Sequence, residues 1–202
     1  VAISKFAAKE AERLYRKKAY SVIYLGTTSL LFEKQSIKKE KDSIAILSVS
    51  RLTPYKGFHL IIEAIKKIKA DRKIIFTIAG SQPKIGYLQY LKKIGKDMVQ
   101  IVIDPSDKEL ALLYQRSDIY VTADRYLYFG LLIFEAAQFE KPTVSLNFAA
   151  AHELIVHGKT GFVANNLNEF SYYLQKLIED EKLRKDLGYN ALQWSKTFSW
   201  EK

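Results

Sequence analysis

The chain has 202 residues, 48% of them hydrophobic, so it can bury a core and is not an intrinsically disordered polypeptide. No run approaches the roughly 20 apolar residues of a membrane-spanning helix, and the opening residues VAISKFAAKE lack the pattern of a secretory signal. The absence of cysteine excludes disulfides and thiolate metal sites. We therefore expect a cytoplasmic protein.

The charge balance is basic, because 32 lysines and arginines face 22 aspartates and glutamates, for a net charge of +10. About half of this excess lies in residues 1–42, which hold ten basic and five acidic residues. A basic chain favours phosphate-bearing partners, either nucleotides, nucleic acid or an anionic membrane surface. We expect no nucleic-acid partner, since no RNA- or DNA-binding motif is present. Peripheral membrane attraction through residues 1–42 is a hypothesis that flotation with anionic vesicles tests.

The first part of the chain is predicted to contain a helix, a strand and a linker. Residues 4–18 form a helix pattern that Ser4 can cap. Residues 20–25 are β-branched and aromatic, which predicts a short strand, and residues 31–43 are polar and charged without periodicity. We interpret residues 1–42 as an interdomain segment.

From Ile44 onward, apolar strands alternate with amphipathic helices. Strands are predicted at 44–50, 73–80, 98–103, 118–123, 142–146 and 161–164. Helices are predicted at 58–70, 87–96, 106–116, 131–140, 152–156, 170–180 and 181–198. This alternation, without hairpin signals, indicates a parallel sheet covered by helices on both faces. Residues 43–202 are therefore predicted to form one α/β domain, a doubly wound, Rossmann-like parallel sheet.

Ligands in such folds bind beyond the carboxyl ends of the strands. After the first predicted strand, Arg51 and Lys56 flank a turn, and Gly57 opens a helix. Two cations beside the free N–H groups of a helix N-terminus suit a diphosphate. The alternative interpretation is a surface loop with two ordinary basic residues.

A second candidate site follows the fourth predicted strand. Phe129 and Gly130 lead into a helix whose first free N–H groups lie around Leu131. Glu135 stands alone in this apolar helix, and a carboxylate there is costly to bury without a partner. It is either paired with a lysine such as Lys141 or available to a ligand such as the two hydroxyls of a ribose.

Five segments in this order resemble the C-terminal domain of GT-B glycosyltransferases, in the large retaining group 1 family: SRLTPYKGF, TIAGSQP, SDKELALLYQRSDIYV, FGLLIFEAAQFEKPTVSLN and HELIVHGKTGFV. That family includes mannosyl- and glucosyltransferases, sucrose synthase and glycogen synthases. The resemblance covers about residues 44–202, and residues 1–31 resemble the crossing from the N-terminal domain.

The resemblance implies specific contacts to a nucleoside diphosphate sugar, the donor. Arg51, Lys56 and the neighbouring Gly57 would hold its diphosphate. The backbone amides of Gly130 and Leu131 would approach the distal phosphate or the sugar. No metal or other cofactor is implied.

Further contacts are implied for the rest of the donor. Glu135 occupies the position of the second acid of the family's Glu-x(7)-Glu motif, which binds the ribose. The loops at Gly80–Ser81 and Ile103–Asp104 would contact the base.

The donor-sugar region departs from the family pattern. The resemblance places Leu127 and Phe129 in the donor-sugar region. The first acid of the motif should stand eight residues before Glu135, but Leu127 occupies that position. A one-residue shift could let Asp124 serve, although the register of the Phe-Gly-Leu turn argues against it.

The implied function is transfer of a hexose from a nucleoside diphosphate to an acceptor hydroxyl, with retention of anomeric configuration. Family members also carry an N-terminal, acceptor-binding domain, so we expect this chain to be a fragment that is inactive without that domain. The alternative is a non-catalytic, degenerate nucleotide-sugar-binding module or subunit.

Overall fold

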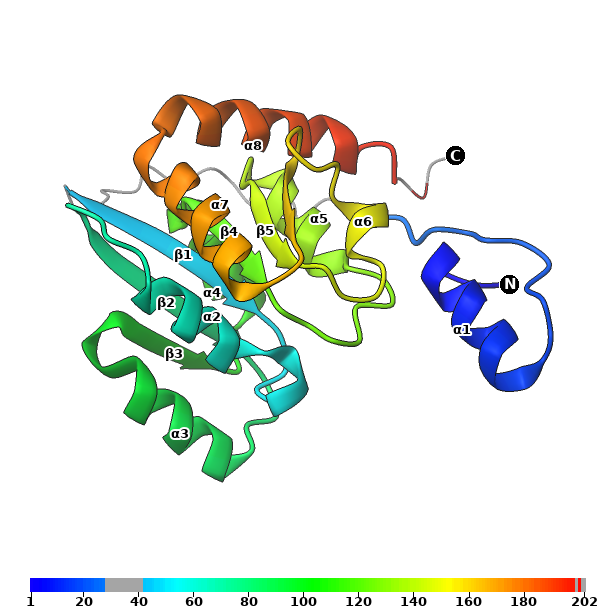
Figure 1. Ribbon diagram of the computed structural model, residues 1–202, viewed down its shortest axis with the longest axis horizontal. Helices are drawn as coiled ribbons and strands as arrows, with labels where there is room; N and C mark the ends of the chain where they lie inside the picture. The colour runs from blue at the N-terminus through cyan, green and yellow to red at the C-terminus, as the bar shows by residue number, and fades with distance from the viewer. Residues whose placement is uncertain (28–41, 199, 201–202) are drawn as a thin grey trace.

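The computed structural model describes residues 1–27, 42–198 and 200 (Figure 1). The strands are β1 (Ser43–Val49), β2 (Lys73–Gly80), β3 (Val99–Ile103), β4 (Ile119–Thr122), β5 (Thr143–Leu146) and β6 (Gly161–Ala164). The helices are α1 (Lys5–Tyr15), α2 (Phe58–Lys66), α3 (Ile85–Gly95), α4 (Asp107–Arg116), α5 (Leu131–Gln138), α6 (Ala151–Leu154), α7 (Leu167–Glu179) and α8 (Glu181–Ser195). Short 3₁₀ turns occupy Pro54–Lys56 and Lys96–Met98.

The six strands form one parallel sheet in the order β3-β2-β1-β4-β5-β6. Both faces of the sheet are buried. Ile44 and Ile46 of β1 belong to the core beneath α2, α3 and α7, whereas Leu47 and Val49 belong to the core beneath α4 and α5. α8 packs against α5 (Figure 1). The predicted doubly wound α/β fold is confirmed.

The strand order reverses direction at β1. The chain builds outward from β1 through β2 to β3, then crosses back to place β4 on the other side of β1. Ile46 and Leu47 of β1 lie beside Ile119 and Tyr120 of β4, so the two strands end close together. The carboxyl ends of strands at such a reversal are where open α/β sheets bind ligands.

The N-terminal predictions need two corrections. The helix ends at Tyr15, three residues early, because Arg16 takes a left-handed conformation with φ of 57°. The predicted strand at 20–25 is wrong. Within the described residues, this segment forms only an isolated parallel bridge between Ala2 and Val22, because its backbone hydrogen bonds there go only to Ala2. The predicted linker lies almost wholly outside the described residues, and the domain division at residue 42 stays a prediction.

A carboxylate from α6 holds the N-terminal segment against the sheet domain. Glu153 accepts hydrogen bonds from the backbone N–H groups of Lys5 and Phe6, both at 2.7 Å, and from the Tyr24 hydroxyl at 3.0 Å. Two free N–H groups at the start of α1 are thereby satisfied by a negative charge, which also suits the helix dipole. Burial raises the pKa of Tyr24, and its hydrogen bond to Glu153 adds to this increase.

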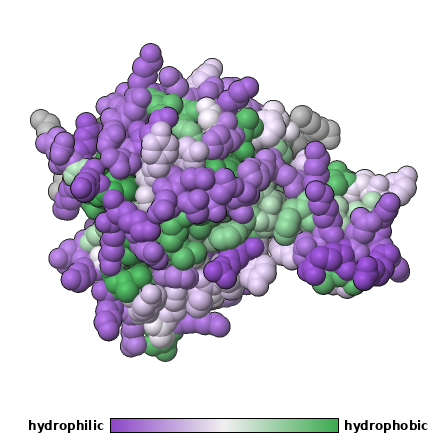
Figure 2. All heavy atoms as spheres, in the orientation of Figure 1, coloured by the Kyte–Doolittle hydropathy of each residue, from purple (hydrophilic) through white to green (hydrophobic). Residues whose placement is uncertain are grey.

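Hydrophilic side chains cover most of the face shown in Figure 2 and crowd the outer part of the α1 lobe. Lys5, Lys9 and Arg13 of α1 are exposed. Within the described ranges, no helix is both long and apolar enough to cross a bilayer. The attraction of residues 1–42 to an anionic membrane stays a prediction.

Replacing Glu153 with glutamine should release α1 from the sheet domain. The variant loses the charged acceptor for two backbone N–H groups, an interaction worth roughly 2 kcal/mol. Hydrogen exchange measured by mass spectrometry should then show at least tenfold faster exchange in residues 2–15, with β1 unaffected. Glu10→Gln is the matched control, because Glu10 forms an ion pair with Arg13 inside the same helix. Equal protection of α1 in wild type and Glu153→Gln would contradict the anchoring role.

Candidate functional site

A cavity of about 240 Å³ opens at the carboxyl ends of β1 and β4. Its walls come from the loops after both strands, the start of α5 and two residues of the N-terminal segment. It is lined by Ile3, Leu25, Val49, Ser50, Lys56, Tyr120, Thr122, Asp124 and residues 126–133. Among these lining residues Lys56 is the one base and Asp124 the one acid, so the cavity wall carries no net charge.

Gly57 allows the start of α2 to lie directly against the end of β4. Its φ is 74°, and a Cβ atom there would stand 2.5 Å from the carbonyl oxygen of Ala123. Any other residue would therefore push the two loops apart. This close approach places Lys56, at the end of the preceding 3₁₀ turn, inside the cavity.

Lys56 forms an ion pair with Asp124, with 2.5 Å between Nζ and Oδ2. The two side chains are only 13% and 8% exposed, respectively. The other carboxylate oxygen of Asp124 accepts a hydrogen bond from the Tyr126 backbone N–H at 3.0 Å. The sequence predicted Lys56 in the site but did not predict Asp124 as its partner. The only sequence feature that could have revealed this pairing is the position of Asp124, an acid at the carboxyl end of a buried strand.

Arg51, the second predicted cation, is exposed and is not among the residues that line the cavity. Its guanidinium carbon lies 5.9 Å from the centre of the Tyr55 ring, and Nζ of Lys56 lies 5.2 Å from the same ring. Both cations therefore lie near the same aromatic ring. The structure brings them to one loop but places only Lys56 in the cavity wall.

The loop between β4 and α5 gives Leu127 a largely structural role. Leu127 is 7% exposed and packs in the core beneath α4 and α5, although it borders the cavity. Phe129 packs against Phe134 with 5.6 Å between ring centres. Gly130 fits tightly, since a Cβ atom there would lie 2.9 Å from side chains of Ile133 and Leu154. Helix α5 then begins at Leu131, which lines the cavity. The free N–H groups of the first turn of α5 therefore lie near the cavity.

Glu135 lies one turn further along α5 and is not among the lining residues. Its Oε2 accepts a hydrogen bond from the hydroxyl of Tyr114, in α4, at 3.0 Å. Burial raises the pKa of Glu135, and the Tyr114 hydrogen bond partly opposes this. Burial also raises the pKa of Tyr114, which keeps its proton and remains a donor. Tyr114 was not among the partners predicted for this carboxylate.

The loops predicted to contact a base are joined by backbone hydrogen bonds at the same edge of the sheet. Leu52 donates to the carbonyl of Ser81 at 2.8 Å, and Asp104 donates to the carbonyl of Gly80 at 2.9 Å. A Cβ atom on Gly80 would lie 1.7 Å from the Ser50 carbonyl oxygen, so only glycine fits there. Ile103 is 44% exposed beside them.

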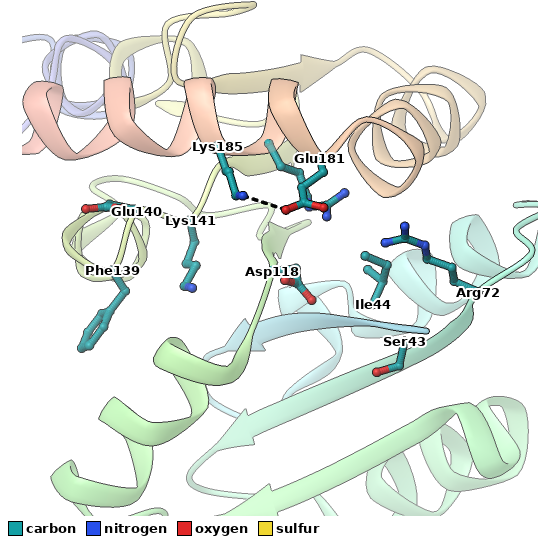
Figure 3. Close-up of a pocket in the computed structure, with 10 residues that line it drawn as sticks. Ser43, Ile44, Arg72, Asp118, Phe139, Glu140, Lys141, Glu181 and Lys185 are labelled. Atoms are coloured by element: carbon teal, nitrogen blue, oxygen red, sulfur yellow. Dashed lines mark ion pairs between the residues drawn. The ribbon is translucent and has the colours of Figure 1, made fainter. Parts of the chain in front are cut away.

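A second pocket of about 340 Å³ lies at the opposite, amino-terminal edge of the sheet. Figure 3 shows Glu181 and Lys185 of α8 on one side of it and Ser43 and Asp118 on the other. Three of its charged residues take part in interactions within the fold: Glu181 pairs with Lys185 at 2.7 Å, and Arg184 donates to two carbonyls at the end of α7. In the part of the chain that the structure describes, no group of three acidic or histidine residues could hold a metal ion.

The comparison with known proteins settles the family. A family model described as glycosyl transferases group 1 matches residues 31–194. The chain belongs to this family. The family resemblance inferred from the five sequence segments is therefore confirmed.

Two individual glycosyltransferases resemble the chain over nearly its full length. An uncharacterised glycosyltransferase of Methanocaldococcus jannaschii is 28% identical over 205 residues, covering 100% of this chain and 56% of the relative. The crystal structure of a glycosyltransferase from Rickettsia africae has a TM-score of 0.85 at 23% identity, covering 98% of this chain and 58% of that one.

A third similar structure was solved with ligands. Anabaena HepE, in complex with UDP and glucose, has a TM-score of 0.79 at 22% identity, covering 98% of this chain and 58% of that one. At these identities the solved structures show a shared fold. The chain spans about half the length of the curated relatives it matches.

Replacing Glu135 with glutamine should stabilise the protein at neutral pH. Because burial raises the folded pKa of Glu135, the group contributes most to stability below its unfolded pKa, and this contribution is lost as pH rises through the folded pKa. Glutamine removes the buried charge and still accepts from Tyr114. We expect a higher Tm than wild type at pH 7, and this difference should disappear near pH 4.

Thermal unfolding at both pH values, followed by circular dichroism, measures this difference. Glu63→Gln is the control, because Glu63 is an exposed glutamate on α2. A Glu135→Gln variant less stable than wild type at pH 7 would contradict the expected sign.

Proposed function

We propose that this chain is the donor-binding part of a retaining glycosyltransferase. It binds a nucleoside diphosphate sugar and presents the hexose to an acceptor hydroxyl held by an N-terminal domain of the longer protein. The observation that carries this proposal is the cavity at the ends of β1 and β4, which contains Lys56 and borders the N-terminus of α5. Anabaena HepE, a relative of the same fold, was solved with UDP and glucose, which supports a ligand of this class.

The geometry of the cavity supports the following contacts. Lys56 meets the diphosphate inside it, and the exposed Arg51 approaches from the same loop. The N–H groups at Gly130 and Leu131 face the distal phosphate, where the dipole of α5 favours negative charge. The remaining parts of the donor extend along the same edge of the sheet.

Two further groups of residues take the nucleoside. Glu135 binds the ribose hydroxyls, with Tyr114 holding one carboxylate oxygen and leaving the other to accept. The base lies against the joined loops at Gly80–Ser81 and Ile103–Asp104.

The chemistry assigned to this chain is electrostatic. Breaking the bond between the sugar and the diphosphate leaves negative charge on the departing phosphate and positive character on the sugar. A preorganised ammonium group and helix N–H groups stabilise the departing charge, commonly by several kcal/mol in a water-poor site. The acceptor hydroxyl then bonds to the sugar on the face that the phosphate left and passes its proton to the departing diphosphate, which retains the anomeric configuration.

One observation favours a second candidate, a nucleotide-sugar-binding module without catalysis. Leu127 stands where the family carries an acid, and its side chain is packed in the core. Release of nucleoside diphosphate, assayed with acceptor and the longer protein, separates the two. Turnover excludes the non-catalytic module, and binding without turnover excludes the enzyme.

Lys56→Ala tests the proposed donor site. Removing the ammonium group leaves the Asp124 carboxylate in the cavity, so the wall becomes negative and repels a diphosphate. We expect the affinity for the nucleoside diphosphate to fall at least tenfold, or about 1.4 kcal/mol, by isothermal titration calorimetry. Lys66→Ala is the matched control, because Lys66 is an exposed lysine at the far end of the neighbouring helix α2 and does not line the cavity. Unchanged affinity of the Lys56 variant would sink the proposed site.

A further inference from the structure

Asp124 is fixed inside the cavity by donors from two loops. Its Oδ2 lies 2.5 Å from Nζ of Lys56, and its Oδ1 accepts from the Tyr126 backbone at 3.0 Å. The side chain is 8% exposed. Because both oxygens are held, the carboxylate stays beside Lys56 in place of turning out to solvent.

This arrangement changes what Lys56 can offer to an anion. An ammonium group has three N–H donors, so two remain for phosphate oxygens while one stays on Asp124. Any phosphate bound there also lies close to the Asp124 carboxylate. Charges repel more strongly in a partly enclosed cavity than in bulk water, and the repulsion grows with the charge of the ligand.

The ligand before transfer and the ligand after transfer differ in charge at this position. The diphosphate of a nucleotide sugar is esterified at both ends and carries about two negative charges. Once the sugar has left, the terminal phosphate gains a second ionisation with a pKa of about 6, so the free diphosphate carries about three charges at pH 8. The sugar also brings hydroxyl groups that can donate to a carboxylate, which the free diphosphate lacks.

We propose that Asp124 is a specificity-determining residue that makes the cavity favour the nucleoside diphosphate sugar over the free nucleoside diphosphate. It penalises the more highly charged ligand through repulsion and accepts hydrogen bonds from the sugar of the other. This inference rests on the proposed function, because it requires the diphosphate at Lys56. It gives the protein a way to release product without loosening its hold on the donor.

Asp124→Asn tests this proposal with little change of shape. The asparagine side-chain oxygen can still accept from the Tyr126 backbone, and only the negative charge is removed. Dissociation constants at pH 8 are measured calorimetrically for UDP, GDP and ADP and for the glucose ester of each. The pair that binds wild type most tightly is then compared in the variant.

The expected result is a split between the two ligands. The free diphosphate should bind Asp124→Asn about tenfold more tightly than wild type, whereas the affinity for the glucose ester should change by no more than about threefold. Asp186→Asn is the matched control, since it removes one exposed charge from α8, away from the cavity lining. It should leave the ratio of the two dissociation constants unchanged.

The contrary outcomes are distinguishable. Equal changes for both ligands would overturn the specificity role and leave the proposed donor site standing. Failure of all six ligands to bind wild type would overturn the donor site itself, and this inference with it. If Asp124→Asn does not fold, Asp124→Ser replaces it, because a serine hydroxyl at that position can accept from the Tyr126 N–H.

Discussion

The ion pair between Lys56 and Asp124 is the constraint on which the candidate site depends. It joins the loop after β1 to the loop after β4, and Gly57 permits the backbone contact that brings them together. A buried ammonium group without a partner would be strongly unfavourable, as would a buried carboxylate. The pair therefore keeps a cation in the cavity and at the same time limits how strongly that cation attracts phosphates.

The fold was predictable because it depends on patterns within single segments. The continuous apolar run of residues 44–50 predicts burial on both faces, and Ile46 and Leu47 do face opposite cores. The strand predicted at 20–25 failed because strand formation also depends on a neighbour. Among the described residues that neighbour is Ala2 alone, which gives a bridge in place of a sheet strand.

The site was predictable only where local turn chemistry decides it. Gly57 and Gly130 open helices, and Lys56 stands beside the first of them, so sequence spacing revealed these positions. Asp124, Tyr114 and Glu153 were missed as partners because each acts on a residue far along the chain. Asp124 is 68 positions from Lys56, and Glu153 is 148 positions from Lys5. Such pairings arise from the strand order, which a single sequence does not display.

We propose that the carboxyl edge of the sheet, at the junction of β1 and β4, binds a nucleoside diphosphate. Amide NMR spectra recorded during titration with UDP, GDP and ADP locate the binding site directly. We predict the largest shifts at Gly57, Gly130 and Leu131, with Ser43 and Asp118 at the amino edge unchanged. Shifts confined to the amino edge, or none with any of the three nucleotides, would contradict it.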